Sequence, residues 1–204
     1  MDKEMGNVKH ISPSATIYSP RVTIDHSVKV GEYSIIGKKG IDSKRKTVIK
    51  KVFTIGAHSI IYQGVVIKKN TQVEDFCRIG EDTTIGENCR IVYGAKIYGN
   101  VNIGNTCVIG GFICEDVNIG NCCRIFGQIV HKHDSNNDFC DMDKWDNGGV
   151  SAPTIGNNVF IGFGAIVAGE ITIGDGSYIF PGAIITKDVL PNSRVKGING
   201  SLNK

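Results

Sequence analysis

Aliphatic residues recur at every sixth position over a long stretch of this chain, in one unbroken phase. The main run consists of Ile49, Ile55, Ile61, Ile67, Val73, Ile79, Ile85, Ile91, Ile97, Ile103 and Ile109. The same period appears before it at Ile24, Val30 and Ile36, and after it at Ile155, Ile161, Val167, Ile173, Ile179 and Ile185. A period of six fits neither the turn of an α-helix nor the two-residue alternation of a half-buried strand. It predicts a short strand followed by a corner, repeated many times.

The residues between the aliphatic positions favour a solenoid. Glycine often follows the aliphatic residue, as at Gly56, Gly80, Gly86, Gly104 and Gly110, and the fifth position of each unit is small or medium-sized. Glycine and asparagine tolerate the unusual φ angles that tight corners need. We therefore predict an all-β fold, a parallel β-helix with three flat faces and about 18 residues per coil, in which the aliphatic residues stack inside.

Two segments interrupt the repeat, at about 37–48 and at about 131–153, and the period also slips near Ile113 before it resumes at Ile119 and Ile125. Long insertions in a compact domain are usually functional or disordered. The first is basic and lacks aromatic residues, so we interpret it as a surface loop near an acceptor or a neighbouring subunit. The second carries two histidines, several acidic residues and the only tryptophan, and we expect the chemistry there. We expect one domain over 1–200 with a short tail at 201–204.

The composition of the chain argues against several classes of function. The 23 basic and 20 acidic residues give a net charge of +3, too balanced to suggest a nucleic-acid partner. No apolar run is long enough for a membrane span and the N-terminus does not resemble a signal peptide, so we expect a cytoplasmic protein. The sequence contains seven cysteines, an odd number, and none of them has the CxxC spacing typical of metal or redox sites, so we do not expect a disulfide framework. Cys77, Cys89, Cys107 and Cys123 fall on the small fifth position, where we expect them to pack as reduced thiols in the core.

The repeat, together with the order of motifs in the second half, resembles the hexapeptide-repeat acyltransferases that acetylate sugars, antibiotics and amino acids. That order is a histidine-bearing loop, then Pro-x-Ile-Gly at 153–156, then about five hexads that end in Thr-Lys-Asp-Val at 186–189. The resemblance implies a left-handed parallel β-helix with one long protruding loop. It also implies a homotrimer that binds acetyl-CoA in a cleft between subunits, with a loop histidine as general base.

The chemistry explains the need for a base. An acceptor hydroxyl must lose its proton as its oxygen attacks the thioester carbonyl, and imidazole can take that proton near neutral pH. Two histidines are candidates. His131 is six residues beyond Ile125, at the root of the loop, whereas His133 is followed by Asp134 and better matches the His-Asp pair often seen in relatives. The sequence leaves both open, and no nucleophilic cysteine is required.

The resemblance also implies the residues that contact acyl-CoA, mostly through their backbone. By position in the motif these are Gly162, Phe163, Ala165, Pro181, Thr186 and Lys187. Lys187 is the candidate cation for a phosphate of CoA, with Arg194 and Lys196 as further candidates. Trp145 is a candidate for stacking on a sugar ring or for packing against a neighbouring subunit. No metal site is expected.

Two rival functions remain. A γ-class carbonic anhydrase needs three histidines around zinc, but the only close pair is His131 and His133. A non-catalytic β-helix scaffold would need only the repeat, because a fold does not by itself imply an activity. Among acyltransferases we favour, by analogy, a sugar or nucleotide sugar of a surface polysaccharide as the acceptor. The sequence does not identify the acceptor.

Overall fold

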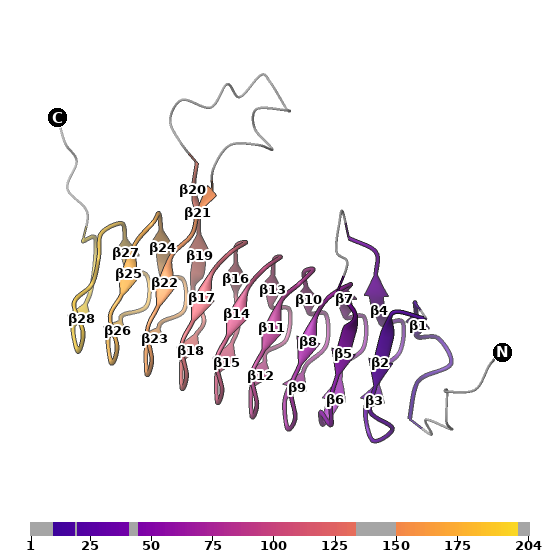
Figure 1. Cartoon of the computed structure of the whole chain (residues 1–204). Helices are drawn as coiled ribbons and strands as arrows, with labels where there is room; N and C mark the ends of the chain where they lie inside the picture. The colour runs from indigo at the N-terminus through magenta and orange to yellow at the C-terminus, as the bar shows by residue number, and fades with distance from the viewer. Residues whose placement is uncertain (1–9, 19, 41–44, 134–149, 200–204) are drawn as a thin grey trace.

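The computed structural model describes residues 10–18, 20–40, 45–133 and 150–199. Over these ranges the chain forms a left-handed parallel β-helix, as the sequence predicts (Figure 1). Each coil contributes one short strand to each of three parallel sheets, and the coils stack from the N-terminal to the C-terminal end. Among the described residues no helix is long and apolar enough to cross a membrane.

The three sheets are called sheets I, II and III. Sheet I contains β1 (Thr16–Ile17), β4 (Ile35–Lys38), β7 (Ile60–Tyr62), β10 (Arg78–Ile79), β13 (Lys96–Ile97), β16 (Phe112–Ile113), β19 (Gln128–Val130), β24 (Ile166–Ala168) and β27 (Ile184–Ile185). Sheet II contains β2 (Val22–Ile24), β5 (Thr47–Ile49), β8 (Val66–Ile67), β11 (Thr84–Ile85), β14 (Asn102–Ile103), β17 (Asn118–Ile119), β22 (Thr154–Ile155) and β25 (Thr172–Ile173). Sheet III contains β3 (Lys29–Val30), β6 (Thr54–Ile55), β9 (Gln72–Val73), β12 (Arg90–Ile91), β15 (Val108–Ile109), β18 (Arg124–Ile125), β23 (Phe160–Ile161), β26 (Tyr178–Ile179) and β28 (Arg194–Val195).

The core consists of the aliphatic residues that define the period. From Ile49 to Ile109 each of them is buried, and each lies in register with its equivalent one coil away, as Ile79 does with Ile61 and Ile97. Cys77, Cys89, Cys107 and Cys123 are buried on the small positions, which confirms the packing role predicted for them. The stack thus buries a continuous apolar column that no single coil could bury alone.

The corners are built from residues with positive φ and from side-chain ladders. At the corner between sheets II and III, for example, Asn88 and Asn158 have φ of 57° and 56°. The side chain of Asn121 accepts the backbone N–H of Asn105 one coil earlier at 2.8 Å. Asn157 in turn donates its backbone N–H to Asp175 at 2.7 Å, and the hydrogen bonds from the backbone and the side chain of Asn157 lower the pKa of Asp175. The ladder satisfies backbone donors that the turns would otherwise leave unpaired.

The hexad count fails at two corners between sheets III and I. Ile113 follows Ile109, and Ile129 follows Ile125, by four positions instead of six, with turns that contain Gly111 and Gly127. A Cβ atom on Gly127 would lie 2.5 Å from the carbonyl oxygen of Ala165, so the coils approach too closely there for a side chain. Ile129 therefore takes the buried position that strict counting from Ile125 assigns to His131.

Candidate functional site

Both insertions leave the β-helix at the same corner, the one that joins sheet I to sheet II. The first lies between β4 and β5, and the second between β19 and β22. The second begins and ends as a two-stranded antiparallel ribbon of β20 (Lys132–His133) and β21 (Val150–Ser151), which projects from the solenoid (Figure 1). We call this edge of the solenoid the insertion corner.

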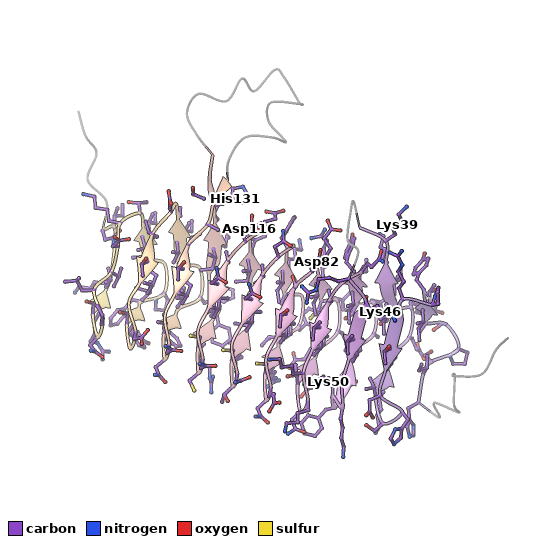
Figure 2. All side chains as sticks on the ribbon, viewed as in Figure 1. Lys39, Lys46, Lys50, Asp82, Asp116 and His131 are labelled. Atoms are coloured by element: carbon purple, nitrogen blue, oxygen red, sulfur yellow. The ribbon has the colours of Figure 1, made fainter. Side chains whose placement is uncertain are left out.

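The parallel register aligns one residue of each coil along the insertion corner, two positions after the buried aliphatic residue of sheet I. This column consists of Gln63, Glu81, Gly99, Glu115, His131, Gly169 and Lys187. Figure 2 labels His131 on this upper edge, with Asp116 and Asp82 following it towards the first insertion at Lys39. The column brings together a histidine, a carboxylate and a lysine that are far apart in the sequence.

His131 lies beside Glu115 in this column. Its Nδ1 atom is 3.4 Å from Oε2 of Glu115, and the histidine side chain is 18% exposed while that of the glutamate is 41% exposed. A carboxylate at Nδ1 favours the tautomer with the proton on that nitrogen, which makes Nε2 the basic one. Asp141, Asp143 and Asp146 of the second insertion lie outside the described residues. Glu115 was missed because only the register shows that it neighbours His131.

Gly169 leaves an open position next to His131. It has a φ of 106°, and among the described residues a Cβ atom added to it would have only Ile171 Cγ2 within 4 Å, at 3.9 Å. On the far side of Gly169 the column continues with Lys187, two strand spacings or about 10 Å from His131. In the column of the insertion corner, the position between the histidine and the lysine therefore carries no side chain.

The thiol of Cys114, which contacts the backbone of His131, is not a nucleophile. Cys114 is buried, and burial raises the pKa of its thiol to about 12, although a hydrogen bond from the backbone of His131 acts in the opposite direction. At neutral pH it is a protonated thiol, and thiolates are the reactive form. This agrees with a mechanism that needs no acyl-enzyme.

The residues predicted to bind acyl-CoA are divided between two corners and the core. Gly162, Phe163 and Pro181 lie at the corner between sheets III and I, where Phe163 is 81% exposed. Glycine is required at position 162 for the two coils to stack this closely, because a Cβ atom there would lie 2.5 Å from the nitrogen of Pro181. The side chain of Ala165 is fully buried, so it contacts the core and not a ligand.

Thr186 and Lys187 lie at the insertion corner, in the coil after Gly169. The side chain of Asn199 holds this turn, because it accepts the backbone N–H of Thr186 at 2.7 Å and donates to the carbonyl oxygen of Lys187 at 2.9 Å. The backbone N–H of Thr186 thus already has a hydrogen-bond acceptor within the chain. Between the two corners the outer face of sheet I presents Ile166 and the partly exposed Ile184.

The other candidate residues lie away from this corner or outside the described residues. The backbone of His133 lies in β20, opposite Val150, and Trp145 lies outside the described ranges. His58 is exposed at a turn with a φ of 54°, stacked between Tyr33 and Phe76. In the part of the chain that is described, no group of three or more metal-ligating side chains is placed to hold a metal ion.

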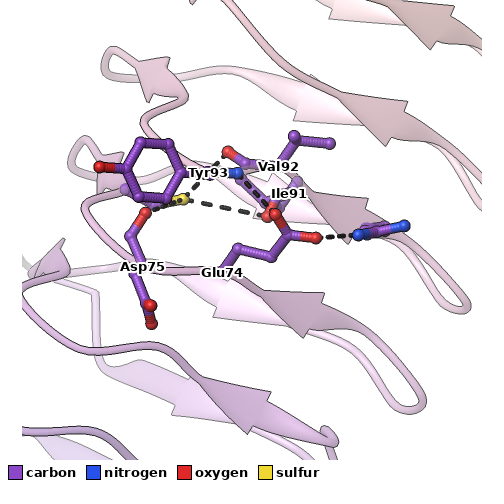
Figure 3. A network of polar contacts seen from close by, with 7 residues as sticks. Glu74, Asp75, Ile91, Val92 and Tyr93 are labelled. Carbon is purple, nitrogen blue, oxygen red and sulfur yellow. Dashed lines mark hydrogen bonds and ion pairs between the residues drawn. The ribbon is translucent and has the colours of Figure 1, made fainter.

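A hollow of about 250 Å³ lies elsewhere, on sheet III and its corner with sheet I. Its lining includes Gln72, Glu74, Asp75 and Tyr93. Glu74 forms an ion pair with Arg90 and accepts the backbone N–H of Tyr93 at 2.8 Å, so its charge is already compensated (Figure 3). This network ties neighbouring coils together, and the hollow contains no histidine.

These features define a class of protein. A three-sided parallel β-helix with a six-residue period is the architecture of the hexapeptide-repeat proteins, and comparison with a family model agrees. Residues 64–99 and 152–187 match the family described as bacterial transferase hexapeptide (six repeats). The family resemblance predicted from the sequence is confirmed.

Individual relatives include the bifunctional protein GlmU of Listeria monocytogenes serotype 4a (strain HCC23), which is 28% identical over 202 residues, covering 90% of this chain and 41% of that protein. GlmU of Acinetobacter baumannii (strain ACICU) is 30% identical over 145 residues, covering 68% of this chain and 32% of that protein. The chain thus spans about two fifths or less of the curated relatives it matches. The crystal structure of UDP-N-acetylglucosamine O-acyltransferase (LpxA) from Moraxella catarrhalis RH4 has the same fold, with a TM-score of 0.59, 24% identity, and coverage of 87% of this chain and 67% of that one.

Proposed function

We propose that this chain is an acyl-CoA-dependent acyltransferase that transfers an acetyl group from acetyl-CoA to a hydroxyl or amino group of a sugar or nucleotide sugar, with His131 as the general base. The observation that carries the proposal is the column at the insertion corner, where Glu115, His131, the open position at Gly169 and Lys187 follow one another. The acyltransferase named among the structural relatives supports the class of reaction.

The proposed reaction is a direct attack. Nε2 of His131 takes the proton of the acceptor hydroxyl or amine as that atom bonds to the thioester carbonyl carbon. Glu115 stabilises the imidazolium that forms, because its carboxylate lies 3.4 Å from Nδ1. The tetrahedral intermediate then collapses, the carbon–sulfur bond breaks, and the CoA thiolate leaves with the proton from the imidazolium.

The donor would occupy the C-terminal side of His131. Lys187 supplies a cation for a phosphate of CoA, and the gap at Gly169 leaves room for the thioester beside the imidazole. The exposed apolar side chains of Phe163 and Ile184 fit an aliphatic pantetheine arm across sheet I. We propose that the protein is a homotrimer, in which a neighbouring subunit closes this open surface of sheet I. We also propose that it acts in the cytoplasm, with acetyl-CoA as the acyl donor.

The test compares four variants with the wild type. The release of CoA is measured with each member of a panel of acceptors, and the products are identified by mass spectrometry. His131→Ala should lower kcat by about 10²–10⁴-fold while the affinity for acetyl-CoA, measured by calorimetry, stays the same. His133→Ala should have a smaller effect. Glu115→Gln should lower kcat less than His131→Ala does, and Asp116→Asn, the matched control one residue away at the same turn, should leave it unchanged.

Two outcomes would contradict the proposal in different ways. If His131→Ala retained the wild-type rate and His133→Ala did not, the base would be His133. If the wild type bound no acetyl-CoA at millimolar concentration, the protein would be a scaffold and not a transferase.

A further inference from the structure

A stack of aromatic and cationic side chains lies on the outer face of sheet I, N-terminal to His131. The guanidinium carbon of Arg78 lies 4.8 Å from the ring centroid of Tyr62 and 4.4 Å from that of Tyr98. Nζ of Lys38 lies 5.4 Å from the same Tyr62 ring, and Tyr98 contacts Phe112 with ring centroids 5.0 Å apart. The planar guanidinium is therefore sandwiched between two tyrosines.

The register explains the sandwich. Tyr62, Gly80 and Tyr98 occupy equivalent positions in three successive coils, immediately after the buried isoleucines of sheet I. Gly80 has no side chain, and a Cβ atom there would lie 2.5 Å from the backbone of Tyr98. The missing side chain leaves a gap of one coil between the two rings, and Arg78 fills it.

The positive charge of this stack is not neutralised by the described residues. The guanidinium of Arg78 forms no hydrogen bond or ion pair with any of them, and its Nη1 atom is buried without a hydrogen-bond partner. Lys96, its direct register partner on the next strand, also lacks an ion pair there. The carboxylate of Glu81, three residues after Arg78, lies instead under the first insertion, where it would overlap a Cβ atom on Gly40.

Two adjacent like charges destabilise a sheet, and an arginine with unused donors loses hydrogen bonds that it could make in water. The guanidinium presents five N–H donors in a rigid fork that matches the geometry of carboxylate and phosphate. Stacking between rings fixes the orientation of that fork. The arrangement is thus prepared for an anion that the described residues do not supply.

The stack lies within reach of a substrate bound at His131. Arg78 is on β10 and His131 follows β19, three strand spacings or about 14 Å away along sheet I. It is on the N-terminal side of the histidine, opposite to Lys187 and Gly169. An acceptor whose reacting group meets His131 would extend its other end towards Arg78.

We propose that Arg78, oriented by Tyr62 and Tyr98 and assisted by Lys96, is an anion subsite that binds the phosphate or carboxylate group of the acceptor. This inference rests on the transferase function proposed above for the choice of ligand, but not for the existence of an anion site. It predicts that the acceptor is an acidic sugar or a sugar phosphate and not a neutral sugar.

The direct test is an NMR titration of the arginine Nε–H signals in the wild-type protein. The probes are glucose, glucose 1-phosphate and glucuronate, which share a ring and differ in charge. The Arg78 signal is assigned from its loss in the spectrum of Arg78→Gln. At constant ionic strength, one of the two anions should shift this signal, and the shift should saturate as the anion concentration rises. Glucose should not. Phosphate is the ligand if only glucose 1-phosphate acts, and carboxylate if only glucuronate does.

Arg78→Lys should weaken the binding of the anion by about tenfold or more, because it keeps the charge but loses the fork. Arg124→Gln is the matched control, since it removes one exposed arginine from sheet III and should leave binding unchanged. In the transferase assay, Arg78→Gln should raise the KM for an anionic acceptor by about 10–100-fold and leave the KM for acetyl-CoA unchanged.

The subsite is refuted if neither anion shifts the Arg78 signal at tens of millimolar, or if glucose shifts it equally. Because this titration needs neither acetyl-CoA nor turnover, it gives an answer even if the protein proves to be no transferase. Conversely, an active enzyme that prefers neutral acceptors, with an unchanged KM in Arg78→Gln, would leave the transferase function intact and refute the subsite.

Discussion

Substitution of a glycine at a shortened corner, compared with one at a full-length corner, tests the register that places His131 outside the core. Gly94 and Gly111 both have positive φ, 72° and 86°, at the corner between sheets III and I. A Cβ atom on Gly94 would have nothing within 4 Å, whereas one on Gly111 would overlap the carbonyl oxygen of Gly127 in the next coil. The pair therefore separates backbone strain from the close approach of two coils.

The expected loss of stability in each variant follows from the surroundings of the glycine that is replaced. Alanine in the left-handed region costs about 1–2 kcal/mol, and the reduced entropy of the unfolded chain offsets about 0.4–1 kcal/mol of it. Gly94→Ala should thus lower the free energy of unfolding by about 1 kcal/mol. Gly111→Ala carries the same strain and must also push two coils apart, which costs about 1–3 kcal/mol more.

Urea unfolding followed by circular dichroism would measure both variants, with the wild type in the same series. If Gly111→Ala were no less stable than Gly94→Ala, the two coils would not be in close contact at that corner. Ile129→Ala gives an independent check, because removing a fully buried isoleucine side chain should cost about 2–5 kcal/mol. A harmless Ile129→Ala would mean that another residue occupies the core position and that the placement of His131 is wrong.

Three further predictions test the core, the donor site and the thiols. Ile97→Asp should prevent folding, because it places an unpaired carboxylate in the apolar column, and a soluble variant with a wild-type circular dichroism spectrum would refute the assignment of the core. Lys187→Ala should raise the KM for acetyl-CoA with little change in kcat, and an unchanged KM would place the phosphate elsewhere. Burial raises the pKa of Cys77 to about 11 and that of Cys114 to about 12, so both should remain protonated and resist alkylation at pH 9 while the exposed Cys122 reacts. Since the unfolded thiols ionise from about pH 9, the free energy of unfolding should fall as the pH rises from 9 towards 12, and Cys114→Ala should reduce that slope.

The sequence by itself determined the solenoid and most of its core. A period of six leaves a single type of architecture, because each aliphatic residue must stack on its equivalent in the next coil to be buried. The burial of Ile79, Ile85 and Ile97, and of the cysteines at the small positions, follows from that period alone. The loop that carries the histidines was also evident, since it is where the period breaks.

The tertiary structure decided which residues meet. Glu115 and His131 are neighbours only because two shortened corners shift the register, so that Ile129 and not His131 enters the core. The sequence grouped Phe163 and Pro181 with Thr186 and Lys187 as one binding motif, yet a three-sided coil places them at different corners. The gap at Gly80 that holds Arg78 between two tyrosines likewise depends on equivalent positions in three coils. A repeat fixes the spacing along the chain, but contacts between coils depend on the length of every intervening corner, and a change of two residues in one corner moves all later side chains relative to earlier ones.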